Sequence, residues 1–462
     1  MRLWVHTVPL GRVNSDEAIS GLIALEVTQG RFRTFFWGQN YGGTLESIAT
    51  ATLMKLSGSN TFSFASIPIL ESICVSLLVY RVSKFRLDPQ SAALAAALSW
   101  VFPASAVLFS TRSMLFYQPT LILGLLAVWA TELLVRSETD RPIAWFVLGF
   151  ALGVGLWCSV QVAFFAVPVA VILLFNRRDY LKGWAAAAVG GALGASPWLI
   201  YFVRNNGSSV TKLANGYGSY FDHLLVILTR GLPIALGARE PNSERWLPRT
   251  GFGFIVIVLM VYGLISCIRR PERRSPLVFV LVAFIPLQAL APGAFYAGSG
   301  RYYIYLAPTV AFVVAATVHR KIWLATVVVA ALAASTTTLW GIRDVEMAPD
   351  ATRPVATFLI EQGIHHIYAH FWVAYKLAWE ADGEIIVASD YERNPQWTRE
   401  VRSASDAAYV MFLPIPQDRI RFERLISGLR NQSIAYREHA VGDYIIIIPD
   451  LNSAPAQFGM GG

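Results

Sequence analysis

The chain carries the acidic stretch NSDEA at positions 14–18 and the aromatic, glycine-rich stretch FWGQNYGGTLE at positions 36–46. A long series of apolar runs follows, with short polar interruptions. Apolar runs of this kind carry little chemistry of their own, so the adjacent carboxylates of Asp16 and Glu17 are the most informative pair in the sequence. Because this pair precedes the apolar runs directly, we expect it to act at the surface of a membrane.

The composition is that of an integral membrane protein. Of the 462 residues, 55% are hydrophobic and 15% are charged, whereas soluble proteins carry about 25% charged residues. The net charge of +8 raises the question of a nucleic-acid partner, but the basic residues lie mostly in short loops between apolar runs. In such loops they act as topology signals. We therefore expect the lipid bilayer as a partner and no nucleic acid.

The apolar runs predict an α-helical polytopic membrane protein with about ten spans. The stretch 143–175 is too long for one crossing and is interrupted near Trp157–Gln161, so it predicts two short spans. The other expected spans lie near 62–82, 89–109, 115–135, 183–203, 251–268, 276–292, 302–318 and 322–341.

Loop charges predict the orientation. Basic clusters such as Arg81/Lys84/Arg86 and Arg269/Arg270/Arg273/Arg274 occupy every second loop, which places those loops in the cytoplasm. The alternate loops, including 204–250 and the segment that contains Asp16, are then external. Since no span precedes Asp16, we expect a first helix upstream that is missing from this chain. The acidic pair and the C-terminal domain are therefore expected on the external side.

The sequence divides into four segments: a first external loop with interfacial helices (1–61), a transmembrane domain (62–342), a small extracytoplasmic α/β domain (343–450) and a disordered tail (451–462). In the third segment, strand-like runs at 366–370, 384–388, 408–413 and 444–448 alternate with helical runs at 371–381 and 419–429, which indicates βαβ character. We interpret this domain as a packing or acceptor-orienting lid. Its histidines, His365, His366 and His370, lack nearby acids in the sequence, so we expect a solvated surface cluster and no metal site.

The acidic pair, the following QxYGGxLE pattern at 39–46 and the many spans of uneven length resemble the GT-C superfamily of membrane glycosyltransferases. The most similar branch contains the protein O-mannosyltransferases and the aminoarabinose transferase of lipid A. The stretches 155–159, 300–302, 369–374 and 383–387 support this resemblance, which covers nearly the whole chain.

The resemblance implies that Asp16 is the general base toward an acceptor hydroxyl. A carboxylate has a reference pKa of about 3.9 and is ionised at neutral pH, so it can accept a proton without special tuning. The alternative is that Asp16 caps the helix that begins near Ile19. Glu17 either supports Asp16 or favours the helix start through the helix dipole.

A departing phosphate requires cations on the external face, and arginine suits phosphate because its planar fork donates two parallel hydrogen bonds. For Arg112 and Arg204 the competing interpretation is snorkelling to lipid headgroups. The candidates for donor-phosphate binding are Arg301, Arg204, Lys212 and Arg112.

Side chains near the same loops are candidates for binding the sugar or the acceptor. They are Gln39, Tyr41, Glu46, Tyr302, Trp157 and Gln161. The residues around Gln39 and Tyr41 fit a simple turn before an interfacial helix as well as they fit a role in binding the sugar or acceptor.

The resemblance implies an inverting glycosyltransferase in the plasma (inner) membrane, with its active site on the external, periplasmic side. Such an enzyme moves a sugar from a polyprenyl-monophosphate carrier to a hydroxyl of a polymer, lipid or protein. The donor is a substrate, and neither a cofactor nor a metal is expected. The sequence identifies neither the sugar nor the acceptor. The alternatives are a polytopic transporter or lipid flippase, a ligase that uses pyrophosphate-linked donors, and a scaffold without catalytic activity.

Overall fold

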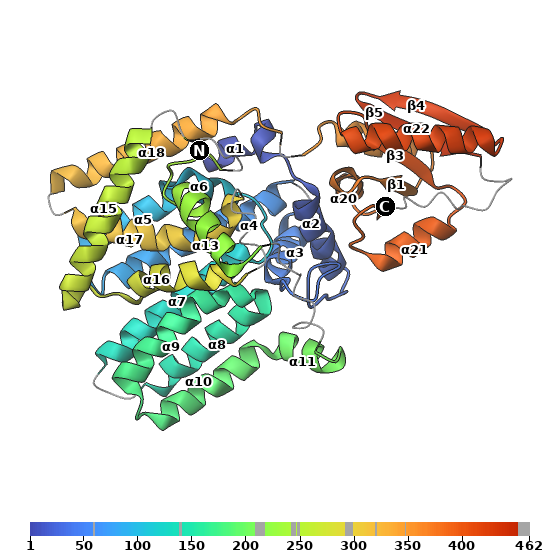
Figure 1. Ribbon diagram of the computed structural model, residues 1–462. Helices are drawn as coiled ribbons and strands as arrows, with labels where there is room; N and C mark the ends of the chain where they lie inside the picture. Colours follow the sequence, from blue (N-terminus) through green and yellow to red (C-terminus); the bar gives the residue numbers. More distant parts are fainter. Residues whose placement is uncertain are drawn as a thin grey trace. The chain divides into compact units, whose positions relative to one another are not determined.

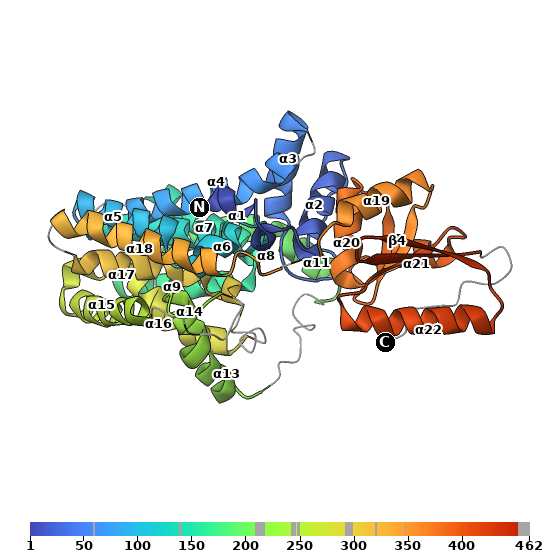
Figure 2. The same ribbon diagram turned by 90° about the horizontal axis from the view of Figure 1, so that it is seen from above.

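Figures 1 and 2 show a computed structural model of the chain. It describes residues 1–58, 61–137, 141–207, 218–241, 246, 250–291, 299–318, 321–346 and 348–450. The predicted phosphate ligand Lys212 and the predicted disordered tail 451–462 lie outside these residues.

The chain divides into two compact units. Unit 1 comprises Met1–Val5, Asn40–Leu45 and Ala65–Arg343, and unit 2 comprises His6–Gln39, Glu46–Phe64 and Asp344–Gly462. Most of the segment expected as a separate first loop therefore groups with the C-terminal part of the chain. The four predicted segment boundaries stay predictions.

Unit 1 is helical, as the long apolar runs predict. Its elements are α1 (Arg2–Val5), α4 (Thr61–Ser83, which begins in unit 2), α5 (Pro89–Val101), α6 (Ala104–Phe109), α7 (Tyr117–Arg136), α8 (Pro142–Cys158), η2 (Val160–Val162), α9 (Ala163–Arg177), α10 (Leu181–Gly194), α11 (Ser196–Arg204), α13 (Tyr220–Val226), η3 (Ile227–Gly231), α14 (Leu232–Ala235), α15 (Thr250–Arg269), η4 (Pro271–Arg273), α16 (Pro276–Ala289), η6 (Gly300–Leu306), α17 (Ala307–Thr317) and α18 (Lys321–Gly341).

By length and composition, several of these helices can cross a bilayer. They are Ser63–Ser83, Tyr117–Arg136, Val160–Arg177 and Trp323–Gly341, with shorter apolar helices at Pro142–Cys158, Ile255–Arg269 and Pro276–Ala289. The predicted interruption near Trp157–Gln161 is confirmed, because α8 ends at Cys158 and α9 begins at Ala163.

Two other predicted spans are broken at prolines. The expected span 183–203 consists of two helices, α10 and α11, which are bent by 63° relative to each other. The expected span 89–109 is also divided, because α5 ends at Val101 and α6 begins after Pro103. Proline has no backbone N–H to donate and its ring clashes with the preceding helical turn, so Pro103 and Pro197 each favour a new helix start.

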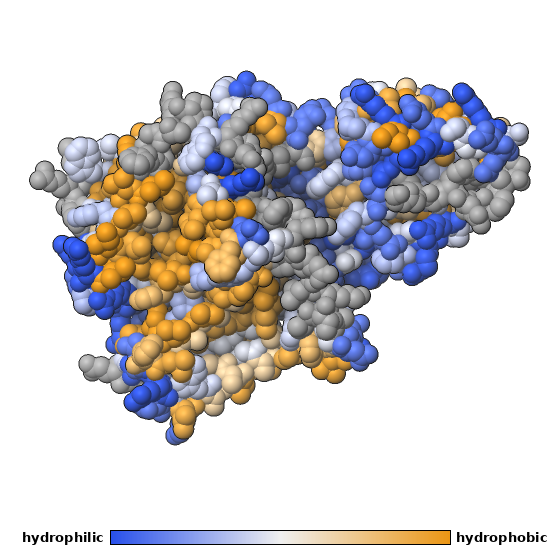
Figure 3. Space-filling model, in the orientation of Figure 1, coloured by the Kyte–Doolittle hydropathy of each residue, from blue (hydrophilic) through white to orange (hydrophobic). Residues whose placement is uncertain are grey.

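The visible face of unit 1 is strongly apolar. Figure 3 shows hydrophobic residues gathered over the helices of this unit, and side chains such as Ile255, Val258 and Val282 are at least half exposed. Apolar side chains exposed in this way are stable in contact with lipid tails. A helix suits this environment because its backbone N–H and C=O groups form hydrogen bonds within the helix. The α/β domain of unit 2 presents a largely hydrophilic face in the same view.

Glycines bring helices α8 and α10 into close contact (Figure 1). A Cβ built at Gly149 would meet the carbonyl oxygen of Ala187 at 1.9 Å, and one built at Gly190 would meet that of Phe146 at 2.3 Å. The sequence pattern small-xxx-small predicts such packing in membranes. The stretches Gly149-x-x-x-Gly153 and Gly190-x-x-x-Gly194 therefore form helix-packing contacts.

Unit 2 combines short N-terminal helices with the α/β domain. Its elements are η1 (Pro9–Gly11), α2 (Ser15–Thr28), α3 (Leu45–Ser57), α19 (Thr352–Glu361), β1 (His366–Ala369), α20 (Phe371–Glu380), β2 (Ile386–Ser389), α21 (Pro395–Ser403), β3 (Ala408–Phe412), α22 (Pro416–Asn431), β4 (Tyr436–Val441) and β5 (Tyr444–Pro449). Strands β1, β2, β3 and β5 and helices α20 and α22 lie where the sequence predicts them. Strand β4 and helices α19 and α21 were not predicted.

The strands form one sheet of order β2-β1-β3-β5-β4. Strands β1, β2 and β3 are parallel, whereas β5 pairs antiparallel with β3 and β4. The β1-α20-β2-α21-β3 connection confirms the predicted βαβ character. Figure 2 shows α22 along one face of the sheet and α19 along the other, so the apolar strands are covered on both sides.

Helix α2 packs against helix α20. A Cβ at Gly21 would lie 2.6 Å from the ring of Trp379, so glycine is needed for this approach. At the start of α2, the hydroxyl of Ser15 donates a hydrogen bond to the carbonyl oxygen of Phe371 over 2.5 Å. These contacts place the N-terminus of α2 beside the loop that follows strand β1.

A network of charged side chains holds the carboxyl ends of the parallel strands together. Arg421 of α22 donates to Asp390 over 2.8 Å and to Asp418 over 3.2 Å, and the amide of Phe371 donates to Asp390 over 2.8 Å. Burial opposes ionisation of Asp390, but the hydrogen bonds from Arg421 and Phe371 hold its pKa below the ordinary value. Burial raises the pKa of Asp418.

The histidines of this domain have carboxylate partners. His366 lies 2.7 Å from Asp406, and His370 lies 3.5 Å from Asp390. The expectation of a solvated cluster without nearby acids is therefore wrong for these two residues, because folding brings in acids from distant loops. Within the described ranges, no three His, Cys, Asp or Glu side chains gather as a metal-ligand group.

Leucine at Gly149 or Gly190 is expected to destabilise unit 1 by roughly 1–3 kcal/mol, because the new side chain must displace the backbone of the facing helix. Thermal unfolding in detergent measures the effect as a lower Tm. Gly191→Ala is the control, since its Cβ would lie 3.6 Å from the nearest atom. Leucine variants that melt like the wild type would contradict this packing.

Asp390→Asn is expected to lower the stability of the protein at neutral pH by about 1–3 kcal/mol, the usual cost of breaking charge-assisted hydrogen bonds. Because the folded-state pKa of Asp390 lies below its unfolded value, its contribution is present above the unfolded pKa and lost as pH falls through the folded pKa.

The measurement is the difference in Tm between wild type and Asp390→Asn in buffers from pH 7 down to pH 3. This difference should shrink on acidification, whereas that for the exposed control Glu423→Gln should stay small throughout. A difference for Asp390→Asn that is the same at every pH would show that its carboxylate is not stabilised by Arg421.

Candidate active site

Asp16 lies in the first turn of α2, and its neighbours form the helix cap. The side-chain oxygen of Asn14 accepts a hydrogen bond from the Glu17 amide, and the Glu17 carboxylate accepts one from the Asn14 amide, both over 3.0 Å. This capping box assigns the N-cap to Asn14, so the alternative interpretation of Asp16 as the N-cap is wrong. Glu17 is 2% exposed and serves the helix start, which favours the second of its two interpretations.

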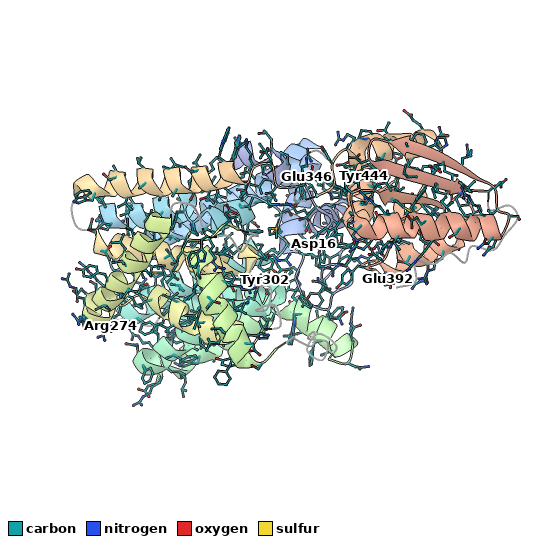
Figure 4. All side chains as sticks on the ribbon, turned by 45° about the horizontal axis from the view of Figure 1, so that its top comes forward. Asp16, Arg274, Tyr302, Glu346, Glu392 and Tyr444 are labelled. Carbon is teal, nitrogen blue, oxygen red and sulfur yellow. The ribbon has the colours of Figure 1, made fainter. Side chains whose placement is uncertain are left out.

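The carboxylate of Asp16 forms an ion pair with Arg393, which the sequence analysis did not identify. The Arg393 Nη2 and Asp16 Oδ1 atoms are 3.6 Å apart, and the two side chains are 11% and 16% exposed. Figure 4 labels Asp16 on α2 and Glu392, the neighbour of Arg393 in the loop after β2. The stretch YERN at 391–394 follows a predicted strand. Functional residues often lie at the carboxyl ends of parallel strands, and this position is the sequence signal that points to Arg393.

Aromatic residues surround this ion pair within unit 2. The guanidinium of Arg393 lies 5.5 Å, 5.6 Å and 4.5 Å from the ring centroids of Phe36, Phe371 and Tyr391. Trp37, from the same quoted stretch as Phe36, stacks edge-on against Trp397 with ring centroids 4.9 Å apart. The first two residues of the FWGQNYGGTLE segment, Phe36 and Trp37, thus pack against the α/β domain.

A second group of predicted residues lies in unit 1, around the start of α7 and η6. Arg301 donates to the hydroxyl of Tyr302 over 3.1 Å, and its guanidinium lies 5.1 Å from the ring centroid of Tyr302. The ring of Tyr302 meets that of Tyr117 edge-on, with centroids 5.9 Å apart. This arrangement presents a half-buried cation within a tyrosine cluster, which suits an anionic headgroup next to an apolar chain.

The other predicted phosphate ligands differ in setting. Arg204 is exposed at the end of α11, as snorkelling predicts. Arg112 is 1% exposed, and snorkelling to headgroups is therefore wrong for it.

Three predicted sugar or acceptor ligands also belong to unit 1. Gln161 accepts a hydrogen bond from the hydroxyl of Tyr305 over 3.0 Å, and Tyr41 is 47% exposed beside Phe116. Trp157 is 7% exposed, and a Cβ at Gly43 would lie 2.7 Å from its carbonyl oxygen. Gly43 therefore permits close backbone contact with the loop after α8.

Gln39 and Glu46 belong to unit 2. The side-chain oxygen of Gln39 is buried and lacks a hydrogen-bond partner among the described residues, and Glu46 is 2% exposed in the first turn of α3. The predicted residues thus divide between the two units: Asp16, Glu17, Gln39 and Glu46 belong to unit 2, and the other described ones belong to unit 1.

Comparisons with known proteins agree with this architecture. Residues 47–201 match the family model described as dolichyl-phosphate-mannose-protein mannosyltransferase. No curated protein sequence matches the chain significantly.

Solved structures match over most of the chain. ArnT from Cupriavidus metallidurans bound to undecaprenyl phosphate is 12% identical, with a TM-score of 0.64 and coverage of 95% of this chain and 94% of ArnT. Apo ArnT from the same organism is 11% identical, with a TM-score of 0.64 and coverage of 94% and 93%. The apo oligosaccharyltransferase from Archaeoglobus fulgidus is 12% identical, with a TM-score of 0.53 and coverage of 86% of this chain and 65% of that chain.

The family match and the ArnT-like architecture confirm the expected resemblance: the chain has the polytopic membrane fold of the GT-C glycosyltransferases, and its segment 47–201 carries the sequence pattern of their mannosyltransferase family.

Proposed function

We propose that the chain is a membrane glycosyltransferase that moves a sugar from a polyprenyl-monophosphate carrier to an acceptor hydroxyl on the external face of the plasma membrane. The observation that carries this proposal is Asp16 itself, a largely buried carboxylate outside the helix cap and paired with an arginine. The undecaprenyl phosphate bound to ArnT and the dolichyl-phosphate-mannose in the family description support the class of donor.

The proposed reaction is a single displacement at C1 of the sugar. Asp16 accepts the proton of the acceptor hydroxyl, and the hydroxyl oxygen forms the new bond to C1. The bond from C1 to the phosphate oxygen breaks, and its electron pair leaves with the prenyl phosphate. Attack from the face opposite the leaving group inverts the configuration at C1.

The negative charge of the leaving phosphate requires a positively charged side chain nearby. The leaving phosphate gains negative charge in the transition state, and a positioned guanidinium stabilises it. We assign this role to Arg301, whose half-buried neighbour Tyr302 offers aromatic surface to the first prenyl units. The donor already carries an activated sugar, so the proposal requires no separate cofactor.

Asp16→Asn is expected to lower kcat by about 10²–10⁴-fold, the usual contribution of a positioned base. Binding of the donor should persist, because the amide keeps the size of the carboxylate. The assay supplies purified protein or membranes with radiolabelled polyprenyl-phosphate sugars and counts the label in the acceptor fraction. Asp179→Asn is the control, since that side chain is 94% exposed. Full turnover by Asp16→Asn would favour a transporter, flippase or scaffold.

Arg301→Gln is expected to weaken donor binding about 10–100-fold, because a charge-assisted hydrogen bond to phosphate contributes about 1.5–3 kcal/mol. Arg301→Lys should lie between this variant and the wild type, since it keeps the charge and loses the planar fork. Donor KM and direct binding of the labelled carrier measure the effect. The exposed Arg269→Gln variant should bind normally, and equal binding by Arg301→Gln would remove Arg301 from the donor site.

A further inference from the structure

The backbone of Arg393 is held by contacts on both sides. Its amide donates a hydrogen bond to the hydroxyl of Tyr375 over 2.9 Å. Asn394, the next residue, caps α21 by accepting from the amide of Gln396 over 3.2 Å. Gly38 has φ +69°, and a Cβ there would lie 3.0 Å from the Cα of Arg393. The loop after β2 is therefore fixed against the segment that follows α2.

The side chain of Arg393 is confined as well. Its guanidinium lies among the rings of Phe36, Phe371 and Tyr391, and such rings attract a cation and restrict its motion. Its Nε atom is buried and has no hydrogen-bond acceptor among the described residues. A buried guanidinium without full hydrogen bonding depends strongly on a nearby negative charge, and Asp16 supplies that charge.

The separation between the two groups suits a role in orientation. At 3.6 Å, the Arg393 Nη2 and Asp16 Oδ1 atoms are farther apart than in a direct hydrogen bond of about 2.7–3.2 Å. Arg393 thus attracts the carboxylate through its positive charge, across a gap slightly longer than a direct hydrogen bond. A base acts only when it is held in the right place and orientation.

Asp16 is fixed from its own side by contacts within the same unit. The Asn14–Glu17 capping box sets the first turn of α2, and Ser15 ties this turn to the carbonyl oxygen of Phe371. Phe371 in turn stacks edge-on against Tyr375, the residue that anchors the Arg393 amide, with ring centroids 5.6 Å apart. The α/β domain therefore contacts both partners of the ion pair.

We propose that Arg393 is a positioning residue that orients the Asp16 carboxylate for proton transfer, and that the C-terminal α/β domain thereby forms part of the glycosyl-transfer site. This inference rests on the proposed function of Asp16. It replaces the interpretation of the domain as a packing or acceptor-orienting lid with a defined chemical role for one of its loops.

Arg393→Gln tests the proposal through separate measurement of kcat and of the KM for the donor. A base displaced by about 1 Å loses up to about 100-fold in rate, so kcat should fall about 10–100-fold while the KM stays within about twofold. Arg393→Lys keeps the positive charge and should recover most of the rate. Arg399→Gln, an exposed arginine on the neighbouring helix α21, should behave as wild type.

Tyr391→Ala provides a second test that does not remove a buried charge. Tyr391 is 57% exposed, so its loss leaves the core of the domain intact, but it takes away the ring closest to the guanidinium. We expect a kcat about 3–10-fold lower with an unchanged KM, because Arg393 becomes less restricted. This variant also decides the question if Arg393→Gln fails to fold.

The outcomes separate this inference from the proposed function. If Asp16→Asn is inactive while Arg393→Gln and Tyr391→Ala keep the wild-type kcat, Asp16 remains the base and the role of Arg393 is wrong. If Asp16→Asn is fully active, the proposed function of Asp16 fails and the role of Arg393 fails with it. If Arg393→Lys is as slow as Arg393→Gln, the positive charge does not position Asp16.

Discussion

The packing of helix α2 against helix α20 is the contact on which the placement of Asp16 depends. Gly21 lets the two helices approach at Trp379, and Ser15 ties the first turn of α2 to Phe371. The capping box of Asn14 and Glu17 then determines which side chain of the acidic pair stays outside the cap. Asp16 is the result: a carboxylate held in place by a folded domain rather than by a loose loop. Strand β1, helix α20 and the loop after β2 all contribute to this placement.

The membrane imposes the second constraint. Helices that face lipid must satisfy their backbone groups internally and expose apolar side chains, which is what unit 1 shows at Ile255, Val258 and Val282. Polar chemistry is therefore confined to loops and helix starts. Arg301 follows this rule, because it lies in the short helix that precedes α17. In the proposed reaction, Arg301 stabilises the leaving phosphate.

The sequence predicted the features that local patterns encode. Apolar runs located most helices of unit 1, and the alternation of strands and helices located most of the α/β domain. Strand β4 was not predicted, because its residues, Tyr436–Val441, are largely polar and pair only with β5 at the sheet edge. Pro103 and Pro197 can be read in the sequence, but a hydropathy pattern does not show that a helix bends or ends there. Asp16 was found through its motif. Arg393 was not, because only the folded chain brings its loop to α2.

Chemical rescue of Asp16→Ala tests whether Asp16 acts as the base. Alanine leaves space at the site of the carboxylate, and formate carries the missing group. If Asp16 is the base, the variant is inactive in chloride buffer, and sodium formate restores part of kcat in a saturable, concentration-dependent manner. Wild-type turnover by Asp16→Ala without formate, or equal recovery in sodium chloride, would contradict this role.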